Sequence, residues 1–456
     1  MSNTRLWALS PLDGKYQNKV SQLQQYFSEA ALIKYRVRIE IKYLIKLSQL
    51  KIIRFFSKKE IQLLNEILEL NNKDLKRVKK IEAKTHHDVK AIEYFIREKI
   101  EKTSLKDMSS FIHFALTSED INNLAYRLMC KSALEKIMLP ELRLVLKNIS
   151  IFAEQNKKIV MLARTHGQAA IPTTLGKEFS VFAVRLLKIM KQLTRFKFDG
   201  KLNGAVGAYH AMFVAYPKIN WLKFSKEFIE DLHLNFIANT TQINPNDDLT
   251  ELFSLMHRIN SVFLDFDQDI WRYISDDWLV QLGKENHVGS STMPQKINPI
   301  EFENSEGNIV LANVLFEAFM NKLPVSRLQR DLSASTISRN YGLAFAHCLL
   351  SYKNFLKGLK SIAPNQKKME MDLNKNWNIL AEALQTVARK KGDIQAYEKV
   401  AAFSKKRVIN QTDWQNMSQE VDKSLLSLTP SNYLGLCEKL TKKTIRDINN
   451  FLKKGA

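Results

Sequence analysis

Glycine and proline are scarce in this sequence, which has 14 glycines and 10 prolines in 456 residues. Their usual combined share is roughly 12%, about twice what is found here. Because glycine and proline break helices and shape turns, their scarcity argues against a fold of many short strands. Few turns over this length predict long helices, in roughly two to four structural units with a large buried core. The composition therefore predicts an α-rich protein.

Long hydrophobic runs and paired cysteines are missing as well. No stretch approaches the roughly 20 continuous apolar residues that a membrane span needs. The opening MSNTRLWALSPLDGKY lacks the apolar core of a secretory signal. The three cysteines, Cys130, Cys348 and Cys437, are far apart, which predicts neither a disulfide framework nor a zinc site. We expect a protein of the reducing cytoplasm without a membrane partner.

Basic residues, in contrast, are abundant, and 69 Lys and Arg against 47 Asp and Glu give a net charge of +22. Such a balance can mark a nucleic-acid binder. The lysines, however, are spread along helical faces, as in KYLIKLSQLKIIRFFSKKE, without an Arg/Gly or aromatic RNA-binding motif between them. We therefore interpret them as a solvated surface and expect no nucleic-acid partner. Part of the charge would also favour a pocket for a substrate with several negative charges.

Apolar residues recur at helical spacing in three long segments. The shared three-four repeat gives each helix one apolar stripe. The stripes consist of Phe182, Leu186, Ile189 and Leu193; of Leu252, Leu255, Ile259, Val262, Phe263, Phe266, Ile270 and Ile274; and of Ile309, Ala312, Leu315, Phe316 and Phe319. Such stripes must pack against one another, so we expect a helical bundle. Stripes on more than one face would extend that bundle across subunits.

The chain is predicted to have three domains. We expect an N-terminal helical domain at 1–106, a central long-helix bundle at 107–360 and a C-terminal helical domain at 361–456. In the first, Ser57 and Glu60 form a capping box that opens the helix EIQLLNEILEL. The last is rich in lysine and contains no motif that we can interpret.

Glycine clusters with polar residues at 283–298, GKENHVGSSTMPQKIN. Such a stretch is most often a surface loop. The longer string GSSTMPQKINPIEFENSEGN, however, resembles the signature of the fumarase/aspartase superfamily of lyases. An elimination next to a carboxylate removes a weakly acidic C–H proton and leaves an anion, which positive charge and N–H donors stabilise. Backbone N–H groups of the Gly-Ser turn and the Lys296 ammonium could stabilise a Ser290 alkoxide in this way. The resemblance implies that Ser290 is the general base.

A second segment, ARTHGQAAIPTTLGKE at 163–178, contains His166. A histidine ordinarily titrates near neutrality and can donate a proton, although a lone histidine is more often structural than catalytic. RTHGQ followed by GKE is similar to the histidine segment of the same lyases. The resemblance implies that His166 is the general acid, which protonates the leaving nitrogen.

The segment KTHHDVKAIEYF at 84–95 invites a metal interpretation through two histidines and an aspartate. Neighbouring residues of one helix point about 100° apart, however, and no further ligand follows at suitable spacing, so we expect no metal.

In FALTSEDINNLAYRL at 114–128, Thr117 or Ser118 caps a helix with two acidic residues in its first turn. The same helix N-terminus also suits an anion.

Two arginines bracket a Ser/Thr cluster in LPVSRLQRDLSASTISRN at 323–340, and Arg330 and Arg339 are suited to bidentate phosphate binding. Together with SPLDGKY, THHDVKA, TSEDINN, NGAVGAY and TTQI, this segment resembles the adenylosuccinate lyase family rather than its argininosuccinate lyase and fumarase siblings. The matching segments run in order from Ser10 to Asn340. The resemblance implies an all-α, three-domain fold with a long central bundle. It also implies substrate contacts by Lys15, Tyr16, His86, His87, Asp88, Thr117, Ser118, Gln242, Ser291, Lys296, Asn298, Asn304, Arg330, Ser335 and Arg339.

The function implied by this resemblance is the release of fumarate from adenylosuccinate, giving AMP. The related succinyl-carboxamide ribotide (SAICAR) would give AICAR in the same way. No cofactor or metal is implied, and the expected assembly is a homotetramer in which each active site is shared by three subunits. Two alternatives stay open: an argininosuccinate lyase, and a basic helical protein without enzymatic activity.

Several residues depart from the pattern that is usual in the family. Lys15 stands in place of arginine, which keeps the charge but loses the bidentate geometry. Gln295 replaces histidine, as it tends to do in argininosuccinate lyases. The others are His86 and Ala208, each in place of Asn, Ala169 in place of Pro, Asn244 in place of Glu, Asn246 in place of His, and Ala334 in place of Asp. None of them is a proposed acid or base, so we expect an intact catalytic centre.

Overall fold

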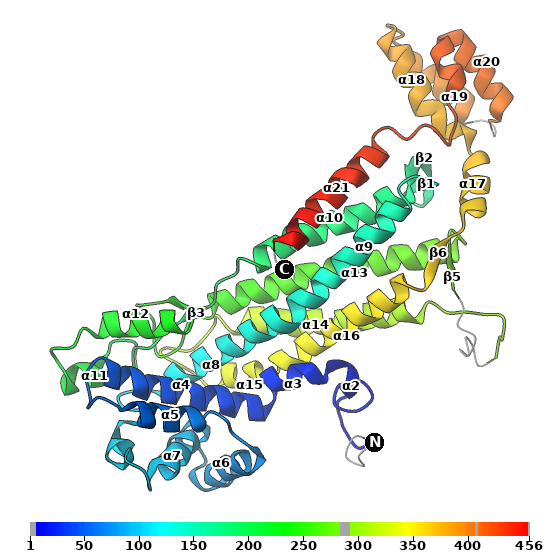
Figure 1. The fold of residues 1–456 in the computed structure, drawn as a ribbon. Coiled ribbons are helices and arrows are strands. Elements are labelled where there is room, and N and C mark those ends of the chain that lie inside the picture. The colour runs from blue at the N-terminus through cyan, green and yellow to red at the C-terminus, as the bar shows by residue number, and fades with distance from the viewer. Residues whose placement is uncertain (1–5, 283–291, 406–408, 455–456) are drawn as a thin grey trace. The chain divides into compact units, whose positions relative to one another are not determined.

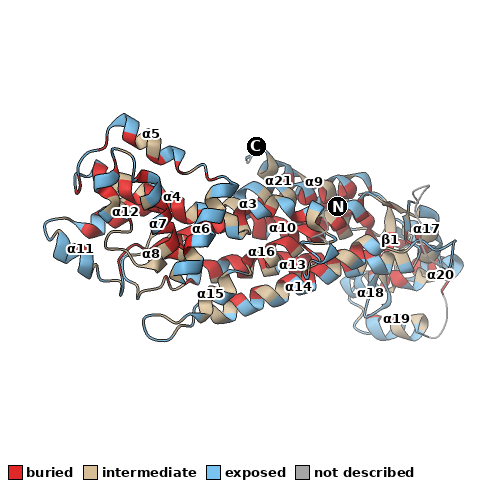
Figure 2. Ribbon diagram, turned by 90° about the horizontal axis from the view of Figure 1, so that it is seen from below, coloured by how far each residue is buried: buried red, intermediate tan, exposed pale blue. Residues whose placement is uncertain are grey.

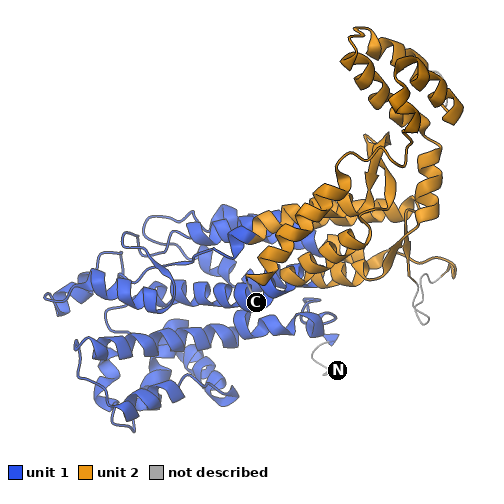
Figure 3. Ribbon diagram, turned by 45° about the horizontal axis from the view of Figure 1, so that its top comes forward, with its two compact units in different colours: residues 1–141, 191–260, 308–350 blue, residues 142–190, 261–307, 351–456 orange. Residues whose placement is uncertain are grey.

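The structure is a computed structural model that describes residues 6–282, 292–405 and 409–454. Helices dominate it, which confirms the predicted all-α class, and the described strands pair only into three two-stranded sheets (Figure 1). The chain divides into two compact units, with unit 1 at 1–141, 191–260 and 308–350 and unit 2 at 142–190, 261–307 and 351–456 (Figure 3). The three predicted domains are a different division and remain a prediction. No helix in the described ranges is long and apolar enough to cross a membrane.

Unit 1 contains the elements from the first part of the chain. Its helices are α2 Gln17–Val20, η1 Ser21–Leu23, α3 Gln24–Phe27, α4 Glu29–Gln49, α5 Lys58–Glu66, α6 Asn72–Thr85, α7 Asp88–Ile100, η2 Lys106–Phe111, α8 Ser118–Ala133, the π-helical turn η3 Leu134–Met138, α11 His210–Ala215, α12 Trp221–Asp231 and α15 Ser333–Ser338. The short strands β3 Asp199–Gly200 and β4 Asn235–Phe236 pair in parallel. Helix α4 packs against α7 and α8, and α6 packs against α7.

Unit 2 contains two antiparallel strand pairs, β1 Val160–Thr165 with β2 Gln168–Thr174 and β5 Leu279–Gln281 with β6 Ile362–Pro364. Its C-terminal helices are α17 Gln366–Asn374, η4 Trp377–Leu380, α18 Ala381–Lys390, α19 Ala396–Ser404, α20 Gln411–Val421, η5 Lys423–Ser427 and α21 Cys437–Lys453. Five long helices have residues in both units: α9 Leu139–Gln155, α10 Leu175–Leu193, α13 Asp247–Ser275, α14 Ile300–Lys322 and α16 Tyr341–Leu359.

The predicted apolar stripes are buried, apart from Ile274 and Leu315, which are half-buried. Buried and exposed stretches alternate along the long helices (Figure 2). The predicted capping box also forms, since the Ser57 side chain accepts from the Glu60 N–H and the Glu60 carboxylate accepts from the Ser57 N–H. Three-four spacing and a cap thus predicted these helices correctly, because both signals depend on residues close in sequence.

The segment around His166 differs from its helical surroundings. It forms a β-hairpin whose strands pair Thr165 with Gln168, so that His166 and Gly167 make the turn. Both have left-handed backbone conformations, with φ of +53° and +74°. Two consecutive residues with positive φ are what the tightest hairpin turns require. The turn therefore places His166 at an exposed tip.

Candidate active site

A pocket of about 380 Å³ lies in unit 1 and brings together segments that are far apart in the sequence. Its described lining comes from α4, from the break between α6 and α7, from the first turns of α8, from the start of α13 and from residues 330–341. Seven residues predicted as substrate contacts line it: His86, His87, Asp88, Ser118, Arg330, Ser335 and Arg339.

The two histidines of the pocket lie in the break between two helices. His86 ends α6 in the left-handed conformation, with φ +51°, and His87 is the N-cap of α7. The assumption that they share one helix was therefore wrong, because a left-handed residue terminates a helix. Asparagine, the usual family residue at position 86, adopts this conformation more readily than most residues.

The ring of His87 is held from both sides. Its Nδ1 accepts a hydrogen bond from the Lys90 N–H at 3.2 Å, so in the neutral ring the proton lies on Nε2. That nitrogen lies 3.5 Å from the Ser118 Oγ at the start of α8. The pocket thereby joins the first turn of α7 to the first turn of α8.

The Asp88 carboxylate lies among positive charges. Its Oδ2 accepts from Arg36 Nη2 at 2.7 Å and from Arg339 Nη2 at 3.2 Å, and its Oδ1 accepts from the Val89 N–H. Burial raises the pKa of Asp88, but the two arginines and the backbone donor outweigh burial, and the pKa lies below its usual value. Asp88 is therefore a carboxylate at neutral pH.

A buried ion pair fixes the start of α8. The Asp120 carboxylate and the Lys201 ammonium are both 0% exposed, and their atoms are 2.9 Å apart. Asp120 also accepts from the backbone N–H groups of Thr117, Asn203 and Gly204. This network confirms the predicted cap at Thr117 and ties it to the NGAVGAY segment, whose relation to the cap the sequence did not show.

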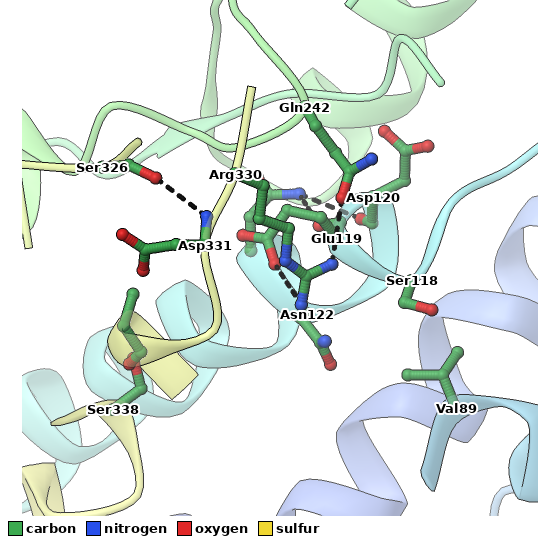
Figure 4. Close-up of polar contacts among 12 residues, drawn as sticks. Val89, Ser118, Glu119, Asp120, Asn122, Gln242, Ser326, Arg330, Asp331 and Ser338 are labelled. Carbon is green, nitrogen blue, oxygen red and sulfur yellow. Dashed lines mark hydrogen bonds and ion pairs between the residues drawn. The ribbon is translucent and has the colours of Figure 1, made fainter. Parts of the chain in front are cut away.

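The loop from NGAVGAY positions Gln242, whose Nε2 donates to the Ala205 carbonyl at 2.7 Å. Close packing here requires glycine at 207, because φ is +73° and an added Cβ would lie 2.0 Å from the Thr240 oxygen. Gln242 in turn accepts a hydrogen bond from Arg330 Nη1 at 3.2 Å (Figure 4). The predicted contacts at 242 and 330 are thus adjacent.

Glu119 lies on the other side of the Arg330 guanidinium, with 4.0 Å between the two groups (Figure 4). Burial raises the pKa of Glu119 above its usual value, and the positive charge of Arg330 lowers it only in part. Asp331, the next residue after the arginine, accepts from the Ser333 N–H at 2.9 Å, and its hydrogen bonds with Ser333, chiefly that of the side chain, lower the pKa of Asp331 to about 2. Arg330 and Ser333 therefore each have an acidic partner.

Other predicted residues are not part of the described lining of this pocket. Lys15 and Tyr16 contact each other, with the ammonium 5.4 Å from the ring centroid, and neither lines the pocket. Lys296 is exposed, and Asn298 is half-buried. Asn304 accepts from the Asn354 amide in unit 2.

The proposed acid, His166, is not among the described residues that line the pocket. His166 belongs to unit 2, whereas the described pocket lining belongs to unit 1. Arg164 stabilises the turn that bears His166: it donates to the Gly167 carbonyl at 3.4 Å and lies over the Trp278 ring. Ser290 and Ser291 lie outside the described residues.

Two departures from the family pattern, Asn244 and Asn246, are buried in the chain interior. Asn246 accepts from Arg127 and donates to the Leu323 carbonyl, and its φ is +64°. Asn244 donates to the Asp199 carbonyl and accepts from the Asn246 N–H. Both asparagines therefore satisfy buried backbone groups and hold the start of α13.

Sequence reasoning missed several pocket residues, chiefly Arg36, Glu119, Asn122 and Tyr126. A signal for Arg36 was present, since it falls among the apolar residues of α4 at helical spacing. A charged residue at such a position needs a buried partner. The sequence could not show that the partner is Asp88, 52 residues away.

Known proteins similar to this chain cover nearly all of it. Residues 14–315 match the lyase family, and residues 326–434 match the adenylosuccinate lyase C-terminal family, a region in which the sequence analysis found no motif beyond about residue 360. The adenylosuccinate lyase of Haemophilus influenzae is 44% identical over 97% of this chain and 100% of its own length. That of Escherichia coli K12 is 42% identical, with coverages of 95% and 98%.

Solved structures with the same fold are more distant in sequence. The 3-carboxy-cis,cis-muconate lactonizing enzyme of Pseudomonas putida is 17% identical, with a TM-score of 0.76, and 94% of this chain and 97% of that chain are covered. A fumarate lyase of Mesorhizobium is 16% identical, with a TM-score of 0.74 and coverages of 93% and 97%. These likenesses confirm the fumarase-like fold. By its full-length identity to the curated enzymes, the chain belongs to the adenylosuccinate lyase family.

Proposed function

We propose that this chain releases fumarate from adenylosuccinate to give AMP, and from SAICAR to give AICAR. The observation that carries the proposal is the pocket of unit 1, in which the predicted arginines, serines and His87 converge. It occurs in a chain that is 42% to 44% identical to adenylosuccinate lyases over nearly its full length.

The nucleotide phosphate is proposed to bind at residues 330–339. Arg330 and Arg339 both line the pocket there with Ser335, and a guanidinium can give two parallel N–H bonds to a phosphate. In the described chain these arginines are held by Gln242, Glu119, Glu29 and Asp88. A phosphate dianion would enter this network as a further acceptor. Lys15 and Tyr16 are proposed to complete the phosphate contacts.

The elimination itself is assigned to Ser290 and His166. The Ser290 alkoxide takes the C–H proton next to the carboxylate of the succinyl group, the C–N bond breaks, and its electron pair moves to the leaving nitrogen. His166 supplies the proton that this nitrogen needs. Lys296 and Asn298, with Ser291 and Asn304, are proposed to hold the carboxylates. His86, His87, Asp88, Thr117, Ser118 and Gln242 are proposed to orient the remainder of the substrate.

A shared active site is proposed because the resemblance to the family implies one. We propose a homotetramer in which the pocket of one copy, the hairpin that bears His166 of a second copy and the catalytic loop of a third copy form each active site. Exposed apolar residues support self-association: α14 has Val310, Leu311 and Val314 on its outside, in addition to its buried stripe. A helix that is apolar on all sides is normally buried, so a second copy would cover this face.

We further propose a cytoplasmic enzyme that needs neither a cofactor nor a metal. Cys130, Cys348 and Cys437 all lie in the described ranges and form no disulfide there, which suits a reducing compartment. Within the described ranges, no three His, Cys, Asp or Glu side chains are grouped in a way that could hold a metal ion.

The proposal is tested by adding adenylosuccinate to the purified protein and following the ultraviolet absorbance as AMP forms. We expect turnover of adenylosuccinate and none of argininosuccinate. Turnover of argininosuccinate alone would assign the chain to the sibling activity. Tight, salt-dependent binding to duplex DNA without fumarate release would instead favour a non-enzymatic basic protein.

A further inference from the structure

Helix α4 presents a buried polar face to the pocket and to the segment that precedes α8. Arg36, Glu40 and Tyr43 are spaced four and three residues apart, so they lie on one side of the helix. All three side chains are nearly or fully buried, with Arg36 2% exposed. Polar groups that are removed from water in this way need specific partners, and each of the three has a partner in a segment with proposed substrate contacts.

Arg36 joins two walls of the pocket. Its Nη2 donates to Asp88 Oδ2 at 2.7 Å, and its Nε donates to Asn122 Oδ1 at 2.9 Å. Asp88 belongs to the first turn of α7 and Asn122 to the second turn of α8. One rigid guanidinium thereby fixes the spacing between the two helix starts from which His87 and Ser118 project.

Glu40 and Tyr43 hold the segment that leads into α8. Glu40 Oε1 lies 2.6 Å from His113 Nδ1, and the Tyr43 hydroxyl donates to the Phe114 carbonyl at 3.0 Å. His113 and Ala115 both have φ of +59°, in the left-handed region that residues with a Cβ disfavour. Such a conformation persists only where its surroundings impose it. The segment ends two residues later at Thr117, the cap of α8.

We propose that the buried polar face of α4, formed by Arg36, Glu40 and Tyr43, positions the substrate-binding segments of the pocket. Arg36 positions Asp88 and Asn122, whereas Glu40 and Tyr43 position the strained segment that delivers Thr117 and Ser118. These three are positioning residues, which act through their partners. Their effect on turnover rests on the proposed function, but their effect on the order of the two segments does not.

The test compares Arg36→Lys and Tyr43→Phe with the wild type. Lysine keeps the charge of Arg36 but loses the two-directional geometry, and phenylalanine keeps the volume of Tyr43 but loses the hydroxyl donor. Amide hydrogen exchange is expected to accelerate at residues 86–91 in Arg36→Lys and at residues 113–120 in Tyr43→Phe. With adenylosuccinate, kcat/KM should fall between about 10- and 100-fold, mainly through a higher KM, because displaced contacts weaken binding.

The matched control is Arg38→Lys, the same change at an exposed position of the same helix. It should leave hydrogen exchange and KM as in the wild type. Unchanged exchange in both segments of both variants would overturn the proposal. So would a fall of kcat in proportion to lost thermal stability with an unchanged KM, since that pattern marks a purely structural role. Because Tyr43→Phe keeps the packing volume, it decides the question even where Arg36→Lys does not fold. A wild type without activity on adenylosuccinate would count against the proposed function alone, and hydrogen exchange would still measure the positioning.

Discussion

The side chain of Arg330 lies between an amide and an acid, Gln242 on one side and Glu119 on the other (Figure 4). Its two Nη atoms are thereby oriented before any ligand arrives. Preorganised donors bind an anion with less ordering cost than mobile ones. This orientation suits the proposed binding of a phosphate by Arg330.

Replacing Arg330 by lysine should weaken substrate binding while leaving the chemical step intact. Lysine keeps the charge but offers no planar fork, so we expect KM to rise by about tenfold, equivalent to about 1.4 kcal/mol, with kcat nearly unchanged. Steady-state kinetics measure this. Arg327→Lys, three residues earlier and exposed, is the control and should not change KM. An unchanged KM in Arg330→Lys would remove this residue from the phosphate site.

Individual site residues could be predicted where they belong to a short sequence motif. His87, Asp88, Ser118, Arg330 and Arg339 were each found within short strings of sequence, and the structure brings them to one pocket. Arg36 and Glu119 were not found, because their importance depends on partners that only the fold brings close. Arg36 is 52 positions from Asp88, and Glu119 is 211 positions from Arg330, so neither pair leaves a local signal in the sequence.

Among the elements, α8 depends on its buried ion pair. Removing Asp120 would leave the fully buried Lys201 ammonium without a counter-charge and three backbone N–H groups without their acceptor. We expect Asp120→Ala to lower the free energy of unfolding by about 3–5 kcal/mol in a urea titration. Asp231→Ala, which removes an exposed partner of Lys46, should cost about 1 kcal/mol or less. Equal effects of the two changes would contradict the assigned role of the Asp120 network.

The segment before α8 should respond to pH through His113. Burial lowers the pKa of His113, but the charge and hydrogen bond of the adjacent Glu40, with the negative charges of Glu93 and Asp120, raise it above its usual value overall. The stability from this pair is therefore fully present below the unfolded pKa of about 6.5 and is lost as pH rises through the higher folded pKa. Glu40→Gln should lower the melting temperature more at pH 6 than at pH 9. A loss that is equal at both pH values, or larger at pH 9, would contradict this.

Some elements were predictable and others were not. The long helices follow from three-four spacing, and the caps at Ser57 and Thr117 follow from neighbouring acidic residues. The hairpin at His166 and the helix break at His86 were not predicted, because each depends on left-handed backbone at residues that do not require it. Arg164, next to the His166 turn, also contacts residues distant in sequence, Trp278 and Asp276, which a sequence motif does not reveal.

At the scale of the whole molecule, the exposed apolar face of α14, formed by Val310, Leu311 and Val314, predicts how copies of the chain assemble. Leu311→Asp would place a charge on the proposed subunit interface, so we expect dissociation of a tetramer of four chains and loss of turnover. Light scattering after gel filtration measures the mass. Leu222→Asp on α12 is the matched control, because Leu222 is 54% exposed and Leu311 is 53% exposed. Dissociation by the control alone, or a wild type that is monomeric, would contradict the proposed assembly.

The pocket and the proposed catalytic residues belong to different parts of the chain. The pocket lies in unit 1, His166 lies on a hairpin of unit 2, and Ser290 belongs to the sequence segment 283–298. In the homotetramer proposed above, different copies of the chain contribute them to one site. Neither His166→Ala nor Ser290→Ala should turn over adenylosuccinate as a homotetramer, although both should fold.

Mixing these two inactive variants tests the claim most directly. Hybrid tetramers formed by dissociation and reassociation would contain some sites in which an intact His166 of one copy meets an intact Ser290 of another. We predict that fumarate release from adenylosuccinate reappears in the mixture at a fraction of the wild-type rate. Hybrid tetramers that form but stay inactive, or full activity in either variant alone, would contradict the account.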